Sequence, residues 1–233
     1  MPSLISQVAT SITRNLQRLK VDERGAIIVE FAYTLPIFTV LGFTGIEIAS
    51  LAVANMRVSQ IAMTAADNLS RAKQSVPSAL PQLREVDVND AFLGARIQGG
   101  ANIPILTNGR IIVSSLQQNS SGKQTILWQR CKGFKNVNSQ YGAQGATQPN
   151  TGTTGFQGMG TGPTRVQAEA NSAVIFAEVT YEYVPMVAPL ILGPITIRKE
   201  AAFYVRDDRD LTQVYNPNPA ATVSACNVYN STF

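Results

Sequence analysis

The run Ala26–Ala54, AIIVEFAYTLPIFTVLGFTGIEIASLAVA, decides the fold of this chain. It holds no basic side chain and two acidic ones, Glu30 and Glu47. As a helix it would extend about 44 Å, more than the ~30 Å hydrocarbon core of a bilayer. About 24 Å of helix would separate the two carboxylates, which places them near opposite interfaces. The run therefore predicts a transmembrane helix, locally kinked or broken at Pro36.

The flank before this run is basic. Its charged side chains are Arg14, Arg18, Lys20 and Arg24 against Asp22 and Glu23. By the positive-inside rule, residues 1–25 are expected to form a cytoplasmic leader of a single-pass protein, with the bulk of the chain outside, in a periplasm-like or extracellular space. Removing these groups from the 19 basic and 15 acidic residues leaves 15 and 13. A nearly neutral remainder predicts no nucleic-acid partner.

The composition argues against an enzyme. The chain has no histidine, which removes His-based acid–base catalysis and the commonest transition-metal ligand. Two cysteines do not make a four-cysteine zinc site. Neither a Walker A pattern nor a dinucleotide-binding glycine motif is present. We expect no catalytic residue, metal, cofactor or small-molecule substrate.

An apolar stripe continues beyond the run, on residues spaced i, i+3, i+4, i+7 and i+11. Its members are Val58, Ile61, Ala62, Ala65 and Leu69. This spacing predicts one helix from about Ala26 to Ala72, ended by Ser75-Val76-Pro77. Residues 26–54 would be its transmembrane part and residues 55–76 its amphipathic continuation. The stripe needs a surface to pack against, such as a small domain or a neighbouring copy.

Residues 77–233 have the pattern of an extracytoplasmic α+β domain. Strands are predicted at Arg110–Leu116 and Gln124–Cys131, and alternation predicts two more at 175–183 and 195–206. One face of this antiparallel sheet would cover the helix stripe, giving a helix-on-sheet fold. The other face would be wet, with cross-strand pairs among Glu178, Glu182, Arg198 and Arg206.

Two connections in this domain are unusual. Residues 136–164 contain seven glycines in 29 positions with many Thr, Gln and Asn, which predicts a mobile loop. It is either a plain insertion or a contact loop that uses Tyr141 and Phe156. Pro185–Pro194 is apolar throughout. That connection is either tucked against the core or an exposed tip that meets a partner or the bilayer.

The two cysteines, Cys131 and Cys226, fall at a strand end and near the C-terminus. Outside the cytoplasm such a pair is expected to form a disulfide. Closing a loop this long contributes up to about 4.7 kcal/mol in the chain-entropy model.

Three alternatives remain for residues 1–54. The segment is a plain signal anchor, or a signal peptide cut after Ala52-Val53-Ala54, or a retained helix whose leader is cut after Gly25. The second requires a leader and an apolar run that are both too long for a signal peptide. The third would make Ala26 a new amino terminus, with Glu30 one helical turn away to neutralise its ammonium.

The stretch Glu23–Ala32, ERGAIIVEFA, followed by Leu35-Pro36, resembles the start of TadE-like proteins of the Tad (Flp-type) pilus machinery. The resemblance covers about residues 22–72. It implies a pilin-like fold, a prepilin-type peptidase that cuts between Gly25 and Ala26, and helix pairing through Glu30, Phe31, Pro36 and Glu47. It also implies pilin-type subunits and the Tad assembly machinery as partners.

The expected function is that of a minor pilin or pseudopilin that primes or caps a fibre. A second hypothesis is an uncleaved membrane-anchored adhesin or receptor. A third, an anchored periplasmic hydrolase, would need two carboxylates that converge in a pocket.

Overall fold

The computed structural model describes residues 24–148, 157–161, 163, 165–187 and 193–232. The chain divides into two compact units, Met1–Ala49 (unit 1) and Ser50–Phe233 (unit 2). The leader expected at residues 1–25 lies outside the described residues up to position 23, as do Phe156 and most of the apolar connection after Val187.

Helix α2, Arg24–Arg71, begins in unit 1 and ends in unit 2. It confirms the single long helix predicted from the apolar run and the stripe that follows it. The helix continues on both sides of Pro36, whose ring nitrogen donates no hydrogen bond to the preceding turn. It ends before Ser75, and Gln74–Val76 forms a short strand, β1, instead of a simple stop.

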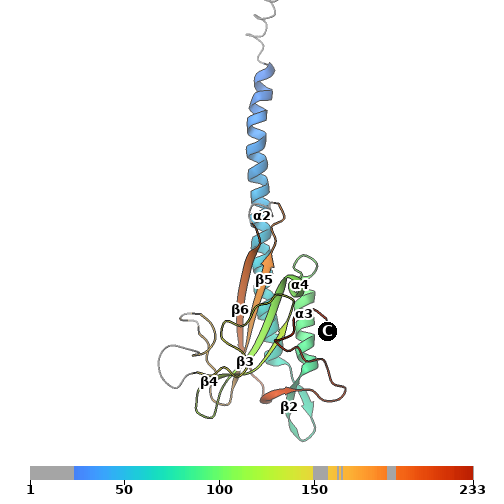
Figure 1. Cartoon of the computed structure of the whole chain (residues 1–233), viewed down its shortest axis with the longest axis vertical. Helices are drawn as coiled ribbons and strands as arrows, with labels where there is room; N and C mark the ends of the chain where they lie inside the picture. Colours follow the sequence, from blue (N-terminus) through green and yellow to red (C-terminus); the bar gives the residue numbers. More distant parts are fainter. Residues whose placement is uncertain (1–23, 149–156, 162, 164, 188–192, 233) are drawn as a thin grey trace, which may run out of the picture. The chain divides into compact units, whose positions relative to one another are not determined.

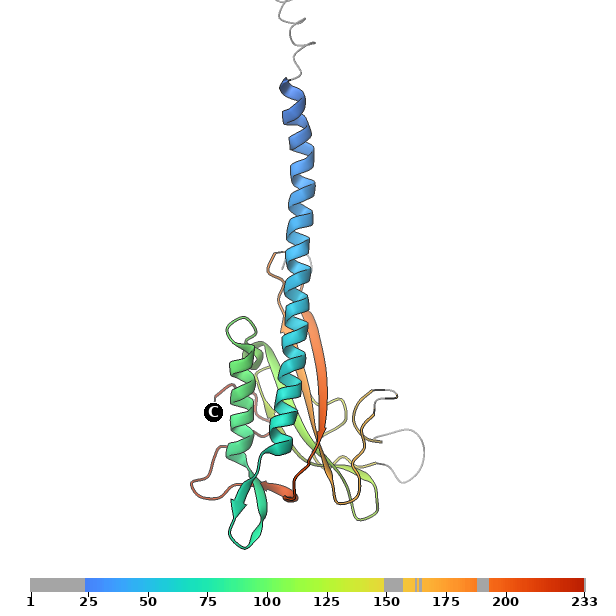
Figure 2. The same ribbon diagram turned by 180° about the vertical axis from the view of Figure 1, so that it is seen from behind.

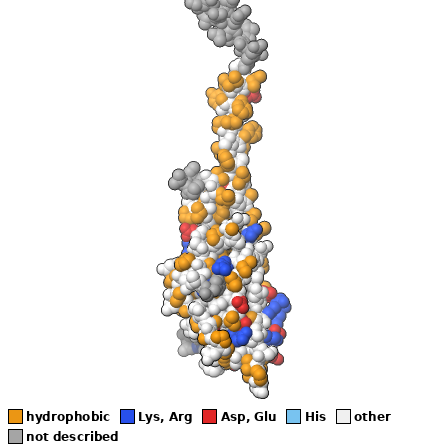
Figure 3. Space-filling view, turned by 90° about the vertical axis from the view of Figure 1, so that its right-hand side faces the viewer, with side chains coloured by type: hydrophobic (Ala, Val, Ile, Leu, Met, Phe, Trp, Pro, Cys, Tyr) orange, Lys and Arg blue, Asp and Glu red, His pale blue; other side chains and the backbone are white. Residues whose placement is uncertain are grey.

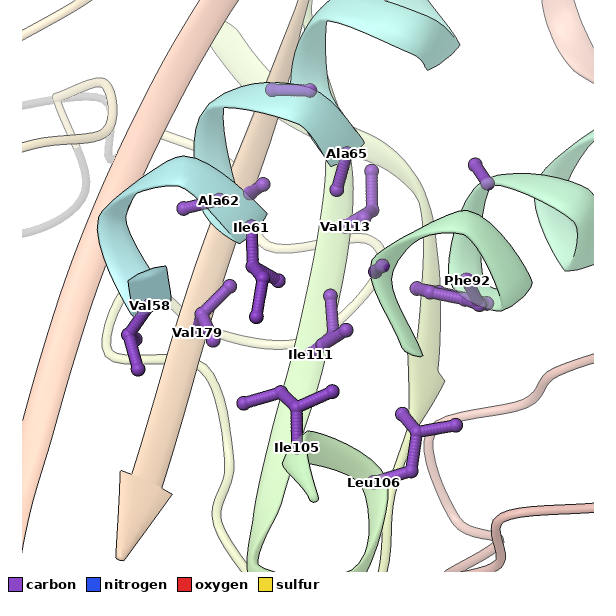
Figure 4. Close-up of a cluster of buried hydrophobic side chains, with 14 of the residues drawn as sticks. Val58, Ile61, Ala62, Ala65, Phe92, Ile105, Leu106, Ile111, Val113 and Val179 are labelled. Atoms are coloured by element: carbon purple, nitrogen blue, oxygen red, sulfur yellow. The ribbon is translucent and has the colours of Figure 1, made fainter. Parts of the chain in front are cut away.

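The core of unit 2 lies between α2 and a sheet (Figures 2 and 4). The predicted stripe residues are all buried, at 1% exposure or less, and they contact Ile111, Val113 and Val179 in one cluster. A second helix, α3 (Glu85–Gly99), lies beside α2 on the same face and adds Phe92 to that cluster. The expected α+β helix-on-sheet arrangement is confirmed for unit 2.

The main sheet has the order β4-β3-β5-β6, and every pair is antiparallel. Its strands are β3 Gly109–Gln118, β4 Gln124–Lys132, β5 Ala173–Tyr183 and β6 Ile195–Tyr204. All four were predicted. Their register sets Ile111 opposite Val179, so that apolar side chains of neighbouring strands share the helix-facing side.

The remaining elements were not predicted. They are α3, the short α4 (Ile105–Asn108), β2 (Ala79–Arg84) and β7 (Asp210–Tyr215). A small second sheet has the order β1-β2-β7, and β2 runs parallel to β7 (Figure 1). It joins the end of α2 to the C-terminal part of the chain.

The face of the main sheet turned away from α2 is covered over part of β3, β4 and β5, where a wet face was expected, whereas Arg198 and Glu200 of β6 are exposed as expected. Leu116, Ile126 and Phe176 form a second cluster there, against which Tyr141 and Ala146 pack. Strand β5 is consequently buried on both faces. The prediction of solvated cross-strand pairs was wrong for Glu178, which is 6% exposed and lies opposite Glu200 in the register.

Candidate functional site

The most conspicuous surface of unit 1 is the apolar part of α2. Ile27 is 73% exposed, Ile28 71% and Val29 55%, and successive residues of a helix point about 100° apart around its axis. Figure 3 shows hydrophobic side chains covering this segment. A helix that is apolar all round is found in a large protein core or in a membrane. The described part of unit 1 provides no such core.

In the described part of the chain, one helix, Gly25–Arg71, is long and apolar enough to cross a membrane. Only 11% of its most apolar window is buried within the protein, whereas the core helix of a soluble protein would be mostly buried. A signal sequence would meet the same criterion. The apolar helix is thus established.

The predicted cleavage residues lie at the start of this helix. Gly25 is helical, and apart from its chain neighbours and the backbone of its own helix, no described atom lies within 4 Å of the place where a Cβ would stand. Ala26 and Glu30 are four residues apart in the helix, so they share one face, one turn apart. Both are exposed. The helix therefore brings together the three residues that the sequence singled out for processing and pairing.

Phe31 and Pro36 follow on exposed positions of the same helix. The hydroxyl of Thr34 donates to the Phe31 carbonyl (3.3 Å), and that of Thr39 donates to the Leu35 carbonyl (2.7 Å). The helix thus satisfies these hydroxyl groups itself, which a surrounding without water requires. Such local satisfaction suits a lipid or helix-packed environment.

Glu47 does not belong to the Gly25–Glu30 group. It lies seventeen positions after Glu30 on α2, which is about 26 Å along the helix axis. It is also 8% exposed, whereas Glu30 is exposed. Glu30 and Glu47, which were both expected to take part in helix pairing, thus lie far apart and in different surroundings.

The predicted disulfide is present. Cys131 at the end of β4 is bonded to Cys226, with their Cα atoms 4.7 Å apart. The Cys131 amide also donates to the Ser224 carbonyl (2.8 Å). The C-terminal segment is thereby tied to the edge of the main sheet.

A buried arginine beside this disulfide was not predicted. Arg110 is 1% exposed, and its guanidinium donates to the carbonyls of Gly133 (2.9 Å) and Cys226 (2.6 Å). It lies 4.1 Å from the centre of the Tyr229 ring. Burial lowers the pKa of Arg110. A cavity of about 460 Å³ borders these residues, and their contacts hold the C-terminal segment on the sheet.

A buried carboxylate anchors the start of the glycine-rich segment. The Glu178 carboxylate accepts hydrogen bonds from the Ser139 hydroxyl (2.5 Å) and from the backbone N–H of Gln140 (2.9 Å). Burial raises the pKa of Glu178, and these two hydrogen bonds oppose the rise. The next residue, Tyr141, lies edge-on to the Phe176 ring with 5.3 Å between ring centres.

These contacts bear on two expectations. The Tyr141 hydroxyl donates to Glu200 (2.8 Å), so Tyr141 is held on the sheet and is not presented to a partner as the contact-loop alternative required. Glu178 and Glu200 lie opposite each other in the register, and both accept hydrogen bonds from residues 139–141. Their geometry supports an anchor for the segment.

Comparisons of the chain with protein-family models, with curated proteins and with solved structures give no match.

Proposed function

We propose that this chain is a membrane-anchored structural subunit, a minor pilin or pseudopilin of a Tad-type pilus or secretion apparatus. The observation that carries the proposal is the exposure of apolar side chains on every side of α2 within unit 1. Such a surface needs lipid or other apolar helices as its surroundings. The resemblance of residues 22–72 to TadE-like proteins supplies the kind of assembly.

The helix crosses the inner membrane with its basic flank in the cytoplasm and unit 2 in the periplasm. The Cys131–Cys226 disulfide supports this placement, because disulfides persist in oxidising compartments and are rare in the cytosol. The span needs about 20 apolar residues, which the part of α2 in unit 1 provides.

A prepilin-type peptidase hydrolyses the bond between Gly25 and Ala26. Hydrolysis leaves Ala26 with a terminal ammonium, and Glu30 of the same or a neighbouring subunit neutralises it. A carboxylate in a transmembrane helix costs about 2.5–3.5 kcal/mol at the bilayer centre and less near an interface, where Glu30 is expected, and a neighbouring ammonium offsets that cost. The exposure of Gly25 supports access for the peptidase.

The test begins with the mature amino terminus. The chain is isolated from native membranes, with and without the peptidase, and its intact mass and terminal sequence are measured. Glu30→Gln then removes the charge and keeps the size of the side chain. We expect a chain that begins at Ala26 only when the peptidase is present, and a Glu30→Gln chain that is cut but missing from sheared surface fibres.

Glu169→Gln is the matched control, because Glu169 is an exposed carboxylate of unit 2 and its loss should leave fibre incorporation unchanged. An uncut chain that still functions would favour the membrane-anchored adhesin or receptor. A chain that begins at Asn55 would identify the helix as a signal sequence and would overturn the proposal.

A further inference from the structure

The connection after β5 carries exposed apolar side chains where loops are usually polar. Val184 is 54% exposed, Met186 74% and Val187 39%. We call these three residues the apolar tip. From Pro185 to Pro194 the sequence has no charged residue and no side chain that forms hydrogen bonds. This composition separates the connection from an ordinary solvated loop.

The apolar tip lies at the end of unit 2 where the chain enters through Ser50. Strand β5 runs past Val179 toward the Val58 end of α2, and its last residue, Tyr183, pairs with Ile195 (Figure 4). Leu51 and Ile195 pack against the same core cluster. In Figures 1 and 2 the described start of this connection lies beside α2.

A neighbouring side chain enlarges this apolar surface. Phe134 is 51% exposed and borders, together with Val184, a shallow cavity of about 250 Å³. Lys135 and Glu182 form an ion pair on the same cavity, so the charge present there is neutralised in place. The cavity thus joins two apolar side chains, Phe134 and Val184, to this ion pair and to Thr107 and Asn108.

The other end of unit 2 carries two ion pairs. Arg71 pairs with Asp67 (2.9 Å) in the last turn of α2, and Lys73 pairs with Asp207 (3.1 Å) just beyond it. Exposed ion pairs of this kind suit water. Ion pairs thus lie at both ends of unit 2, and the end near Ser50 is distinguished by three exposed apolar side chains within four successive residues.

We propose that the apolar tip is a second membrane contact, which inserts into the boundary between headgroups and acyl chains of the bilayer that α2 crosses. The inference rests on the proposed crossing by α2, because a chain that leaves the bilayer near Ser50 places this end of unit 2 at the interface. Exposed Val and Met side chains without charge favour that boundary over water. Together the two contacts fix how unit 2 stands on the membrane.

The test measures lipid exposure in the full-length chain, reconstituted into vesicles of phosphatidylethanolamine and phosphatidylglycerol. Met186→Cys carries a nitroxide, while the native cysteines stay in their disulfide. Spin relaxation by oxygen, which concentrates in lipid, is compared with relaxation by a water-soluble nickel chelate. Leu80→Cys in β2 is the matched control, since Leu80 is apolar and 57% exposed. Phe38→Cys reports on α2 itself.

We expect the oxygen-to-nickel ratio at position 186 to be several-fold higher than at position 80 and to approach the ratio at position 38. A ratio at position 186 equal to that at position 80, with position 38 in lipid, would overturn the inference and leave the crossing intact. Shielding of position 186 from both reagents would overturn it in favour of a protein partner. A water-exposed label at position 38 would remove the crossing and the inference with it.

Discussion

At the scale of single residues, Glu178 links folding to pH. Its pKa is raised by burial, so between the unfolded value of 4.5 and the higher folded value the folded chain keeps a proton that the unfolded chain has lost. Stability from this group is therefore full below pH 4.5 and decreases as pH rises through the folded pKa. Glu178→Gln abolishes this titration and leaves an amide that can still meet Ser139 and Gln140.

The quantity to measure is the unfolding free energy of Glu178→Gln minus that of the unmodified chain. We expect this difference to increase as the pH rises above 4.5 and then to level off. Denaturant unfolding of the full-length chain in detergent measures it, with the fluorescence of Trp128 as the signal, because Trp128 is the single tryptophan and is buried. Ser139→Ala removes a hydrogen bond to the charged form and should steepen the decrease with pH. A difference that does not change with pH would contradict this prediction.

Gly133 is required by backbone conformation and by space. Its φ is +121°, and a Cβ there would stand 2.4 Å from the Gly109 carbonyl oxygen. We expect Gly133→Ala to destabilise unit 2 by about 3 kcal/mol, because strain and a backbone clash add. Gly122→Ala is the control: φ is +74° with nothing within 4 Å, so only strain of about 1 kcal/mol applies. Equal losses of unfolding free energy in the two variants, measured by Trp128 fluorescence, would contradict this prediction, because they would show that the backbone relieves the clash.

The residues that sequence reasoning identified are those whose role depends on near neighbours or on chemistry alone. Gly25, Ala26 and Glu30 lie within about one and a half turns of a single helix, so their spacing alone predicts that they lie close together, while their role in processing and pairing stays a prediction. The disulfide was predicted because the sequence contains two cysteines. Glu178 was misplaced because its burial comes from residues 139–141, which are distant in sequence and polar in composition.

At the scale of elements, the C-terminal end of α2 depends on Arg209. This residue is 6% exposed and donates to the carbonyls of Leu69 (2.8 Å) and Ala72, beside the negative end of the helix dipole. Burial lowers its pKa to about 10, so it stays charged at neutral pH. We expect Arg209→Met to destabilise unit 2 by about 2–4 kcal/mol, since both carbonyls lose a charged donor. Trp128-monitored unfolding measures the loss.

Arg206→Ala is the control for that change, because Arg206 is exposed and its removal should stay within about 0.5 kcal/mol. Arg209→Lys keeps the charge on a shorter, single-headed donor and should recover part of the stability. Equal stability of Arg209→Met and Arg206→Ala would show that α2 ends without help from Arg209.

Elements with strong local patterns were predicted, and those defined by distant pairing were not. Helix α2 and strands β5 and β6 carry a clear period over ten residues or so in the sequence, and β3 and β4 contain short apolar runs between turn residues. Helix α3 also has a period, because Val88, Ala91, Phe92 and Ala95 are buried at helical spacing, but acidic residues and a glycine interrupt it. The pairing of β2 with β7 joins Gln82 to Asp210, and nothing in either segment alone indicates it.

At the scale of the whole molecule, the oxidation state of the two cysteines reports the compartment in which unit 2 folds. If the basic flank holds the amino terminus in the cytoplasm, unit 2 is exported and Cys131 is oxidised with Cys226. Arg14→Gln, Arg18→Gln and Lys20→Gln together remove that bias and leave Arg24 and the Gly25 region unchanged. The altered chain should keep part of its population with unit 2 in the reducing cytoplasm.

A thiol-reactive polymer, added to acid-quenched cells, attaches to chains with free thiols and not to disulfide-bonded chains. The two populations then differ in mass. We expect the unmodified chain to take up the polymer only after reduction, and the Gln variant to take it up partly before reduction. Arg14→Lys with Arg18→Lys is the matched control, because it keeps the charge and should behave like the unmodified chain. Thiols that react before reduction in the unmodified chain would place unit 2 in the cytoplasm. The apolar helix could not then hold the orientation on which a periplasmic pilus subunit depends.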